Sequence, residues 1–180
     1  MRIKKRDTVG LVIDIQERLL PVMTEKELLL KNCVTLIGGL QTLGVPLLVT
    51  QQYTKGLGMT VPEIASVIQD FQPIEKRDFS CCGQPEVMAG LERLNARNVI
   101  LCGIESHVCV LQTALDLKEA SFNPVIVWDA VSSRFPVNLE LARERFRHEG
   151  IMMTSAESIL FELTESSAAP EFRDISKLVK

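Results

Sequence analysis

Residues 99–117 read V-I-L-C-G-I-E-S-H-V-C-V-L-Q-T-A-L-D-L, and this stretch decides the fold. Residues 99–102 are a short apolar, β-branched run that ends at Gly103, which predicts a strand buried on both faces. We expect a helix to follow almost at once, with Ser106 as its N-cap and a wide apolar face from Val110 onward. A buried strand followed directly by a helix is typical of a parallel α/β sheet.

Cys109 lies in the first turn of that expected helix. The unpaired N–H groups and the positive end of the helix dipole favour a thiolate over a thiol there, so Cys109 is a candidate nucleophile. The alternative is that Cys109 is one more buried apolar cysteine, because cysteine is among the most buried residue types. Evidence from residues elsewhere in the chain is needed to choose between these interpretations.

The composition is that of a globular chain with one hydrophobic core. Of 180 residues, 46% are hydrophobic and 24% are charged. We therefore expect a single domain over residues 1–180, with a core from about residue 7 to 163 and a polar, loosely held tail at 166–180. The formal net charge is −3 and the basic residues are scattered, which predicts no nucleic-acid partner. No apolar run approaches the length of a membrane helix, so we expect no membrane partner.

The chain contains five cysteines, an odd number, without a C-x-x-C spacing. Cys81 and Cys82 are adjacent and poorly placed to bridge each other, and no signal peptide is recognisable. We therefore expect a cytoplasmic location. No Cys/His cluster has zinc-ligand spacing, and the glycine-rich loops that cradle phosphates are missing, so we expect no metal and no cofactor.

Short apolar strands alternate with helices about six times along the chain. This alternation predicts a three-layer αβα sandwich around an open, mostly parallel, Rossmann-like sheet of about six strands. The predicted strands cover residues 8–14, 46–50, 71–74, 99–102, 124–129 and 151–154. The predicted helices cover residues 25–43, 64–68, 85–94, 106–117, 139–148 and 156–162.

In such sheets ligands bind at the carboxyl ends of the strands, near a switch in the strand order. Asp14, Lys76 and Cys109 all lie at or just past predicted strand ends. In this arrangement Asp14 accepts the thiol proton, while the Lys76 ammonium steadies both the carboxylate and the thiolate. Each has an ordinary alternative, since Asp14 can cap a helix and Lys76 can be a solvated surface charge. A Cys–His dyad with His107 stays open as well.

Five motifs extend this pattern from about residue 7 to 163. They are D-I-Q-E-R-L-L-P at 14–21, T-Q-Q-Y at 50–53, K-R-D-F-S at 76–80, G-I-E-S-H-V-C-V-L-Q-T-A at 103–114 and D-A-V-S-S-R at 129–134. In this order the motifs resemble the isochorismatase-like cysteine hydrolases, and most closely the small hydrolases of the isochorismatase domain-containing type.

The resemblance implies a triad with Asp14 as base, Lys76 as charge-stabilising partner and Cys109 as the nucleophile of a thioester-like intermediate. It also implies a non-proline cis peptide between Ile104 and Glu105, which aims backbone N–H groups into an oxyanion hole together with the N–H of Cys109. Isochorismatases proper lack the nucleophilic cysteine, so its presence points to hydrolysis of a C–N bond in a small amide or carbamoyl compound. The loop after the second predicted strand lacks the Asp-x-His metal motif of the nicotinamidases.

Five further residues are candidates for lining a substrate pocket. They are Gln16, Gln51, Phe79, Ser106 and Arg134, and Arg134 is a candidate partner for a substrate carboxylate. Each of these residues also has a structural interpretation, such as core packing for Phe79.

The resemblance further implies a homo-oligomer, for which the apolar Leu57, Met59 and Val61 offer contact surface. Two other classes of function stay open. One is a non-catalytic binding or scaffold protein on the same fold, and the other is a redox-active thiol protein. Neither of them needs Asp14 and Lys76 beside Cys109.

Overall fold

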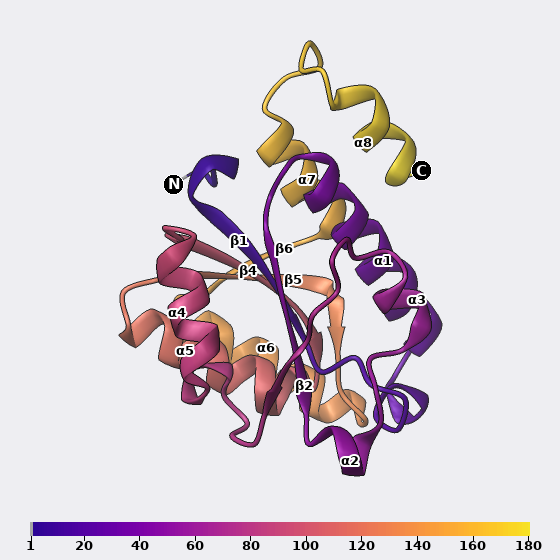
Figure 1. Cartoon of the computed structure of the whole chain (residues 1–180), viewed down its shortest axis with the longest axis vertical. Helices are drawn as coiled ribbons and strands as arrows, with labels where there is room; N and C mark the ends of the chain where they lie inside the picture. The colour runs from indigo at the N-terminus through magenta and orange to yellow at the C-terminus, as the bar shows by residue number, and fades with distance from the viewer. Residues whose placement is uncertain (1) are drawn as a thin grey trace.

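The computed structural model describes residues 2–180, in which strands and helices alternate (Figure 1). The strands are β1 (Thr8–Ile13), β2 (Leu47–Gln52), β3 (Ile74–Lys76), β4 (Asn98–Ile104), β5 (Asn123–Ser132) and β6 (Met152–Thr154). The helices are α1 (Lys26–Thr42), α2 (Thr54–Leu57), α3 (Pro62–Ala65), α4 (Pro85–Arg93), α5 (Leu111–Glu119), α6 (Pro136–His148), α7 (Ala156–Thr164) and α8 (Phe172–Leu178). The connections hold the 3₁₀ turns η1 (Lys5–Asp7), η2 (Leu20–Val22) and η3 (Cys81–Gly83) and the π-helical turn η4 (Ser106–Val110).

All six strands form one parallel sheet in the order β3-β2-β1-β4-β5-β6. β1 and β4 lie side by side at its centre and are buried along their whole length, as apolar strands covered on both faces require. The chain builds the sheet outward from β1 in one direction and from β4 in the other, so the switch point lies between these two strands.

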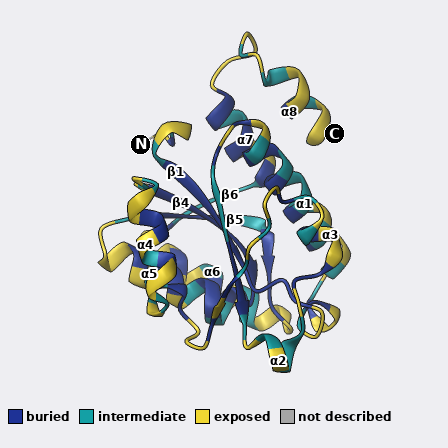
Figure 2. Ribbon diagram, viewed as in Figure 1, coloured by how far each residue is buried: buried dark blue, intermediate teal, exposed yellow. Residues whose placement is uncertain are grey.

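Helices cover both faces of the sheet (Figures 1 and 2). One buried apolar cluster lies beneath α1 and α7 and includes Ile37 and Leu160. The other lies beneath α4, α5 and α6 and includes Val87, Leu117 and Phe146. The predicted three-layer αβα sandwich with a parallel six-stranded sheet is confirmed.

Two element predictions in the middle of the chain are wrong. The third strand is Ile74–Lys76 and not 71–74, because its pairing with residues 50–52 of β2 decides which residues are extended. The helix expected at 64–68 is the single turn α3, which begins at Pro62, a residue favoured at the first helical position.

The carboxyl-terminal segment is not the loosely held tail that its polar composition predicts. α8 packs on α1 and buries Ile175 completely. The ion pairs Lys4–Glu165 at 2.8 Å and Lys5–Glu171 at 2.9 Å connect this segment to the start of the chain. Both termini therefore lie at the same end of the molecule, beyond the amino ends of the central strands (Figure 1). Among residues 2–180, no helix has both the length and the apolar character that crossing a membrane requires.

Candidate active site

Asp14, Lys76 and Cys109 meet at the carboxyl end of the sheet. Asp14 directly follows β1, Lys76 ends β3, and Cys109 lies in the turn η4 after β4. The Nζ of Lys76 is 2.7 Å from Oδ2 of Asp14, and both side chains are fully buried. The Cys109 side chain packs in the same buried region, and its pKa responds to the charges of both residues. Because β2 separates β3 from β1, the long lysine side chain has to reach across the end of β2 to meet Asp14.

The two carboxylate oxygens of Asp14 have different surroundings. Oδ1 accepts a hydrogen bond of 2.8 Å from the Thr50 hydroxyl. Oδ2 lies close to the Lys76 ammonium, yet within residues 2–180 no donor is aligned to give it a hydrogen bond. Asp14 also adopts a left-handed backbone conformation with φ of 53°, which aspartate tolerates better than most residues. Oδ2 is therefore a buried carboxylate oxygen whose close neighbour is the ammonium charge of Lys76.

The ammonium of Lys76 explains why Oδ2 receives no directed N–H. Nζ donates to Gln52 Oε1 at 2.7 Å, to the Phe79 carbonyl at 3.0 Å and to the Asp78 carbonyl at 3.2 Å. An ammonium group carries three hydrogens, and these three acceptors occupy them. The contact with Asp14 is therefore an attraction between charges and not a directed hydrogen bond.

The turn that carries Cys109 differs from the predicted helix start. Ser106–Val110 is a π-helical turn, and the N–H groups of Val108 and Val110 both donate to the Glu105 carbonyl, at 3.1 and 3.2 Å. Ser106 is not an N-cap, because its hydroxyl instead bonds the Ser133 hydroxyl at 2.6 Å. The peptide bond between Ile104 and Glu105 is cis.

The ionisation of the three groups follows from burial and mutual charge. Burial, and then the Asp14 carboxylate, raise the pKa of Cys109 to about 12, although Lys76 acts in the opposite direction. Burial also raises the pKa of Asp14, against the lowering effect of Lys76 and Thr50. Burial lowers the pKa of Lys76, but the neighbouring Asp14, Cys81 and Cys109 bring the net shift upward. These shifts favour a thiol at Cys109 at neutral pH, against the thiolate that the helix start is expected to favour.

Gln16 and Gln51 are both buried, with their amide groups committed to the segment after β2. The side chain of Gln16 donates to the carbonyls of Gln52 and Gly58 and accepts from the Gln52 N–H. Gln51 Oε1 accepts from the N–H and hydroxyl of Thr60. Their observed contacts hold this segment against the end of the sheet.

The other three predicted pocket residues come from different segments: Ser106 from η4, Phe79 from the segment between β3 and η3, and Arg134 from the segment after β5. Ser106 is buried, whereas the Phe79 side chain is about half exposed. Arg134 donates its backbone N–H and its Nε to Glu105 Oε2, at 3.1 and 3.2 Å. A substrate carboxylate would share the Arg134 guanidinium with Glu105.

His107 does not form a dyad with the cysteine in this structure. Its Nδ1 lies 2.9 Å from the Ser133 hydroxyl and its Nε2 lies 3.2 Å from Nδ2 of Asn138. Both ring nitrogens are thus engaged with the segment that leads into α6. In the described part of the chain, no group of three or more His, Cys, Asp or Glu side chains is arranged to hold a metal ion.

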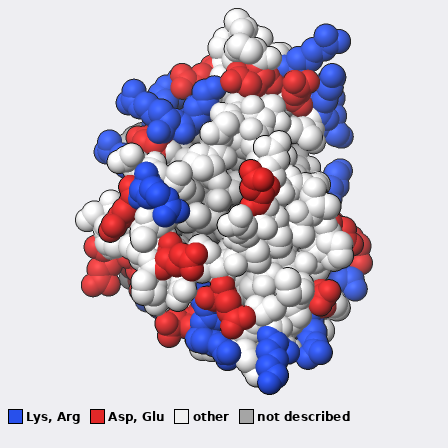
Figure 3. Space-filling model, in the orientation of Figure 1, with Lys and Arg blue, Asp and Glu red and all other residues white. Residues whose placement is uncertain are grey.

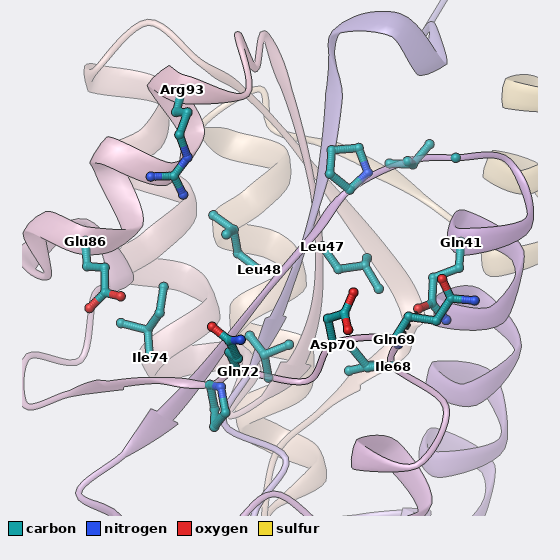
Figure 4. Close-up of a pocket in the computed structure, with 15 residues that line it drawn as sticks. Gln41, Leu47, Leu48, Ile68, Gln69, Asp70, Gln72, Ile74, Glu86 and Arg93 are labelled. Carbon is teal, nitrogen blue, oxygen red and sulfur yellow. Dashed lines mark hydrogen bonds between the residues drawn. The ribbon is translucent and has the colours of Figure 1, made fainter.

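A hollow of the described surface lies away from these residues. It has a volume of about 570 Å³ and follows the edge of β2 at Leu47 and Leu48, between Gln41 on α1 and Arg93 on α4 (Figure 4). β3 pairs only with residues 50–52, so this half of the β2 edge has no neighbouring strand. The hollow contains none of the three residues of the candidate site.

Sequence reasoning missed Gln52, Thr50 and Cys81. Gln52 contacts Lys76, Thr50 contacts Asp14, and the Cys81 sulfur lies 3.7 Å from the Thr50 hydroxyl. The available signal was the polar run at the end of the second strand. Thr50 and Gln52 alternate with Gln51, so the strand period directs them to the opposite face from Gln51.

Comparison with known proteins finds relatives in both sequence and fold. The isochorismatase domain model matches residues 8–158. The secreted isochorismatase effector Isc1 of Phytophthora sojae is 38% identical over 184 residues, which cover 99% of this chain and 87% of the relative. The structure of MAR1 ribonuclease from Caenorhabditis elegans superposes with a TM-score of 0.94 at 36% identity, covering 99% of this chain and 92% of that one.

A more distant structure shares the fold alone. The YcaC gene product of Escherichia coli, described as an octameric hydrolase of unknown specificity, has a TM-score of 0.90 at 20% identity. The alignment covers 99% of this chain and 95% of that one. The domain match spans most of the chain, and the similarity to the effector covers 99% of this chain. The chain therefore belongs to the isochorismatase family.

Proposed function

We propose that the chain hydrolyses a C–N bond of a small amide or carbamoyl compound, with Cys109 as nucleophile, Asp14 as general base and Lys76 as charge-stabilising partner. Family membership supports a hydrolase. The observation that carries the finer proposal is the buried Oδ2 of Asp14, which lies 2.7 Å from the Lys76 ammonium and accepts no directed hydrogen bond within residues 2–180. A carboxylate oxygen beside a buried thiol is suited to accept the thiol proton.

In the first half of the reaction the thiol and the carboxylate act together. The Cys109 sulfur attacks the substrate carbonyl carbon while its proton passes to Asp14, so no free thiolate has to exist beforehand. The C–S bond forms and the carbonyl electron pair moves to oxygen. The C–N bond then breaks as Asp14 returns the proton to the leaving nitrogen. The products of this half are an amine, or ammonia, and a thioester on Cys109.

Water completes the cycle by attacking the thioester. Asp14 takes the water proton, the C–S bond breaks, and the proton returns to sulfur as the acid leaves. Burial raises the pKa of Asp14, and a higher pKa makes this carboxylate a stronger base than an ordinary aspartate. The oxyanion of both halves is assigned, in this proposal, to backbone N–H groups that include that of Cys109, in the turn that follows Ile104 and Glu105.

The test combines turnover with detection of the covalent intermediate. The purified chain is incubated with small primary amides and carbamoyl compounds, quenched with acid and digested for mass spectrometry. We expect turnover together with an acyl group on Cys109. Cys109→Ala should show neither, and Asp14→Asn should lower kcat by on the order of 10²–10⁴-fold. Cys82→Ala is the matched control, since this neighbouring thiol lies outside the proposed machinery.

Three outcomes would contradict the proposal. Turnover that survives in Cys109→Ala, or an acyl group on another residue, would remove Cys109 as nucleophile. A folded chain that hydrolyses no compound of either class would favour the binding-protein alternative.

Nucleic acid is a separate question, because the nematode relative is named a ribonuclease. We propose a small-molecule substrate for this chain, and the argument is electrostatic. The net charge is −3, and on the face shown in Figure 3 acidic and basic side chains are interspersed around a largely uncharged centre. A phosphate backbone is bound mainly through clustered Lys and Arg. Single-stranded RNA is therefore added to the substrate panel, and cleavage that disappears in Cys109→Ala would overturn this choice.

We also propose that the chain forms a homo-oligomer and resides in the cytoplasm. The first proposal is supported by the octameric description of the YcaC product. It is also supported by Phe135, Val137 and Leu141, whose side chains are 60–63% exposed at the start of α6. Val61 cannot contribute the expected contact surface, because it is buried in the core. The second proposal is supported by five cysteines without disulfides, although the Phytophthora relative is named as secreted.

A further inference from the structure

The side chain of Gln52 reaches the proposed triad through Lys76. Its Oε1 accepts from Nζ at 2.7 Å, the shortest of the three hydrogen bonds that the ammonium donates. The distance from Nζ to Asp14 Oδ2 is the same, 2.7 Å, but that contact has no hydrogen-bond alignment. Gln52 and Asp14 therefore compete for the same ammonium group, and Gln52 receives the N–H.

The amide of Gln52 is fixed at both of its ends. Its Nε2 donates to the Arg77 carbonyl at 2.7 Å, which requires that Oε1, and not the amide nitrogen, faces Lys76. Its own backbone is held by the side chain of Gln16, which accepts from the Gln52 N–H at 2.7 Å and donates to its carbonyl at 3.0 Å. These bonds determine where the acceptor lies before any substrate enters.

This arrangement has a chemical consequence for Asp14. A hydrogen bond to a carboxylate stabilises its charged form and lowers its proton affinity, and a bond from an ammonium does so most strongly. If Lys76 donated to Oδ2, Asp14 would be a weaker base and its oxygen would be less available to the thiol.

We propose that Gln52 is a positioning residue that holds an N–H of Lys76 away from Asp14 and so keeps Oδ2 open as the acceptor for the Cys109 proton. The role of Gln52 in catalysis rests on the proposed hydrolase function. The direction of the Lys76 N–H groups does not depend on that function. It can be measured through the reactivity of the Cys109 thiol, whether or not a substrate is known.

The test replaces Gln52 by Met, which has a similar length and no strong acceptor. In Gln52→Met an N–H of Lys76 is free to turn to Oδ2, so the Cys109 thiol loses part of its hydrogen-bond acceptor, which had favoured the protonated form. The pKa of Cys109 should then fall, and iodoacetamide alkylation of Cys109 at pH 8 should become about tenfold faster, which corresponds to one pKa unit. Site-resolved mass spectrometry over a pH series gives the profile.

Gln41→Met is the matched control. Gln41 also accepts one N–H, from Gln69, and donates to one carbonyl, that of Val67, but it lies at the hollow along β2 and away from the site. It loses equivalent hydrogen bonds and should keep the parental alkylation profile. Gln52→Asn, one carbon shorter, provides a second variant if Gln52→Met does not fold, and should shift the profile in the same direction.

Where a hydrolysed compound is known, the kcat/KM profile adds a second readout. The acidic limb that reports the base should move to lower pH in Gln52→Met, and kcat should fall while KM stays close to the parental value. An alkylation profile equal to that of the parent and of Gln41→Met would overturn the inference. A shifted profile in a chain that hydrolyses nothing would leave the inference standing and count against the hydrolase proposal alone.

Discussion

Two opposite charges act on the thiol of Cys109. The rate at which this thiol is alkylated therefore reports the electrostatic balance of the site. The Asp14 carboxylate raises the pKa of the thiol and the Lys76 ammonium lowers it, with burial as the largest cause of the raised value of about 12. Asp14→Asn removes the negative charge, so the pKa of Cys109 should fall and its alkylation at pH 8 should accelerate several-fold. Turnover should nevertheless be lost, because the base is gone.

Lys76→Met should act in the opposite direction on the same thiol. It removes the cation and leaves the carboxylate, so the pKa of Cys109 should rise and alkylation should slow. The measurement is the rate of iodoacetamide labelling at Cys109 between pH 6 and 10, with labelling of Cys82 in the same sample as the internal control. If both substitutions changed the rate in the same direction, the opposing charges would not govern the thiol and the assigned roles would be wrong.

At this scale the sequence predicts which side chains meet at the carboxyl end of the sheet better than how their hydrogen bonds are arranged. The ends of parallel strands locate Asp14, Lys76 and Cys109 at one edge of the sheet. The partner of each lysine proton depends on side-chain positions within a few tenths of an ångström, and no sequence pattern contains that information. For this reason the sequence gives no sign of the bond from Lys76 to Gln52, and it predicts Ser106 as a helix cap although Ser106 bonds Ser133.

Among the elements, the junction of β1 and β4 has the tightest packing next to the site. Gly103 in β4 has a φ of +121°, and a Cβ at this position would lie 2.0 Å from the Ile13 carbonyl oxygen at the end of β1. Gly103→Ala therefore combines backbone strain with a clash against main chain, and we expect it to lower the free energy of unfolding by about 3 kcal/mol or more. Urea denaturation followed by circular dichroism measures the loss.

Gly150→Ala is the control for this prediction. Gly150 also has a positive φ, +66°, but a Cβ there meets no atom within 4 Å. Only the left-handed conformation is penalised, so the cost should be about 1–2 kcal/mol. Equal losses in the two variants would show that the close approach of β4 to β1 is not needed for stability.

Element boundaries were predicted well where local periodicity is strong and poorly where tertiary contacts decide. α1 occupies Lys26–Thr42 against a predicted 25–43, because its apolar spacing extends over several turns. β3 has only three residues, and its place is set by its pairing with β2. α8 was missed because only Ile175 of its residues is fully buried, which gives little apolar signal in a polar segment.

For the whole molecule, the alternation of strands and helices predicts the αβα class. This alternation does not predict the order of the strands in the sheet. The order β3-β2-β1-β4-β5-β6 puts the switch point between β1 and β4, and Asp14 and Cys109 follow these two strands. The hollow along β2 lies elsewhere. The candidate site is therefore at the place that the topological rule predicts and not in that hollow.

The assembly prediction also belongs to the whole molecule. Val137 and Leu141 are one helical turn apart on α6 and are 62% and 63% exposed, and Phe135 precedes them at 60%. Exposed apolar side chains gathered on one face are typical of contact surfaces between subunits, and a charge placed there costs desolvation free energy when the subunits associate.

We expect light scattering at micromolar concentration to give a multiple of the 20.1 kDa chain mass, and we expect Leu141→Glu to reduce the measured mass. Leu178→Glu, on α8 at the opposite end of the molecule (Figure 1), should keep the parental mass. A parent that is monomeric at this concentration would contradict the homo-oligomer, and a Leu141→Glu variant with the parental mass would move the interface away from α6.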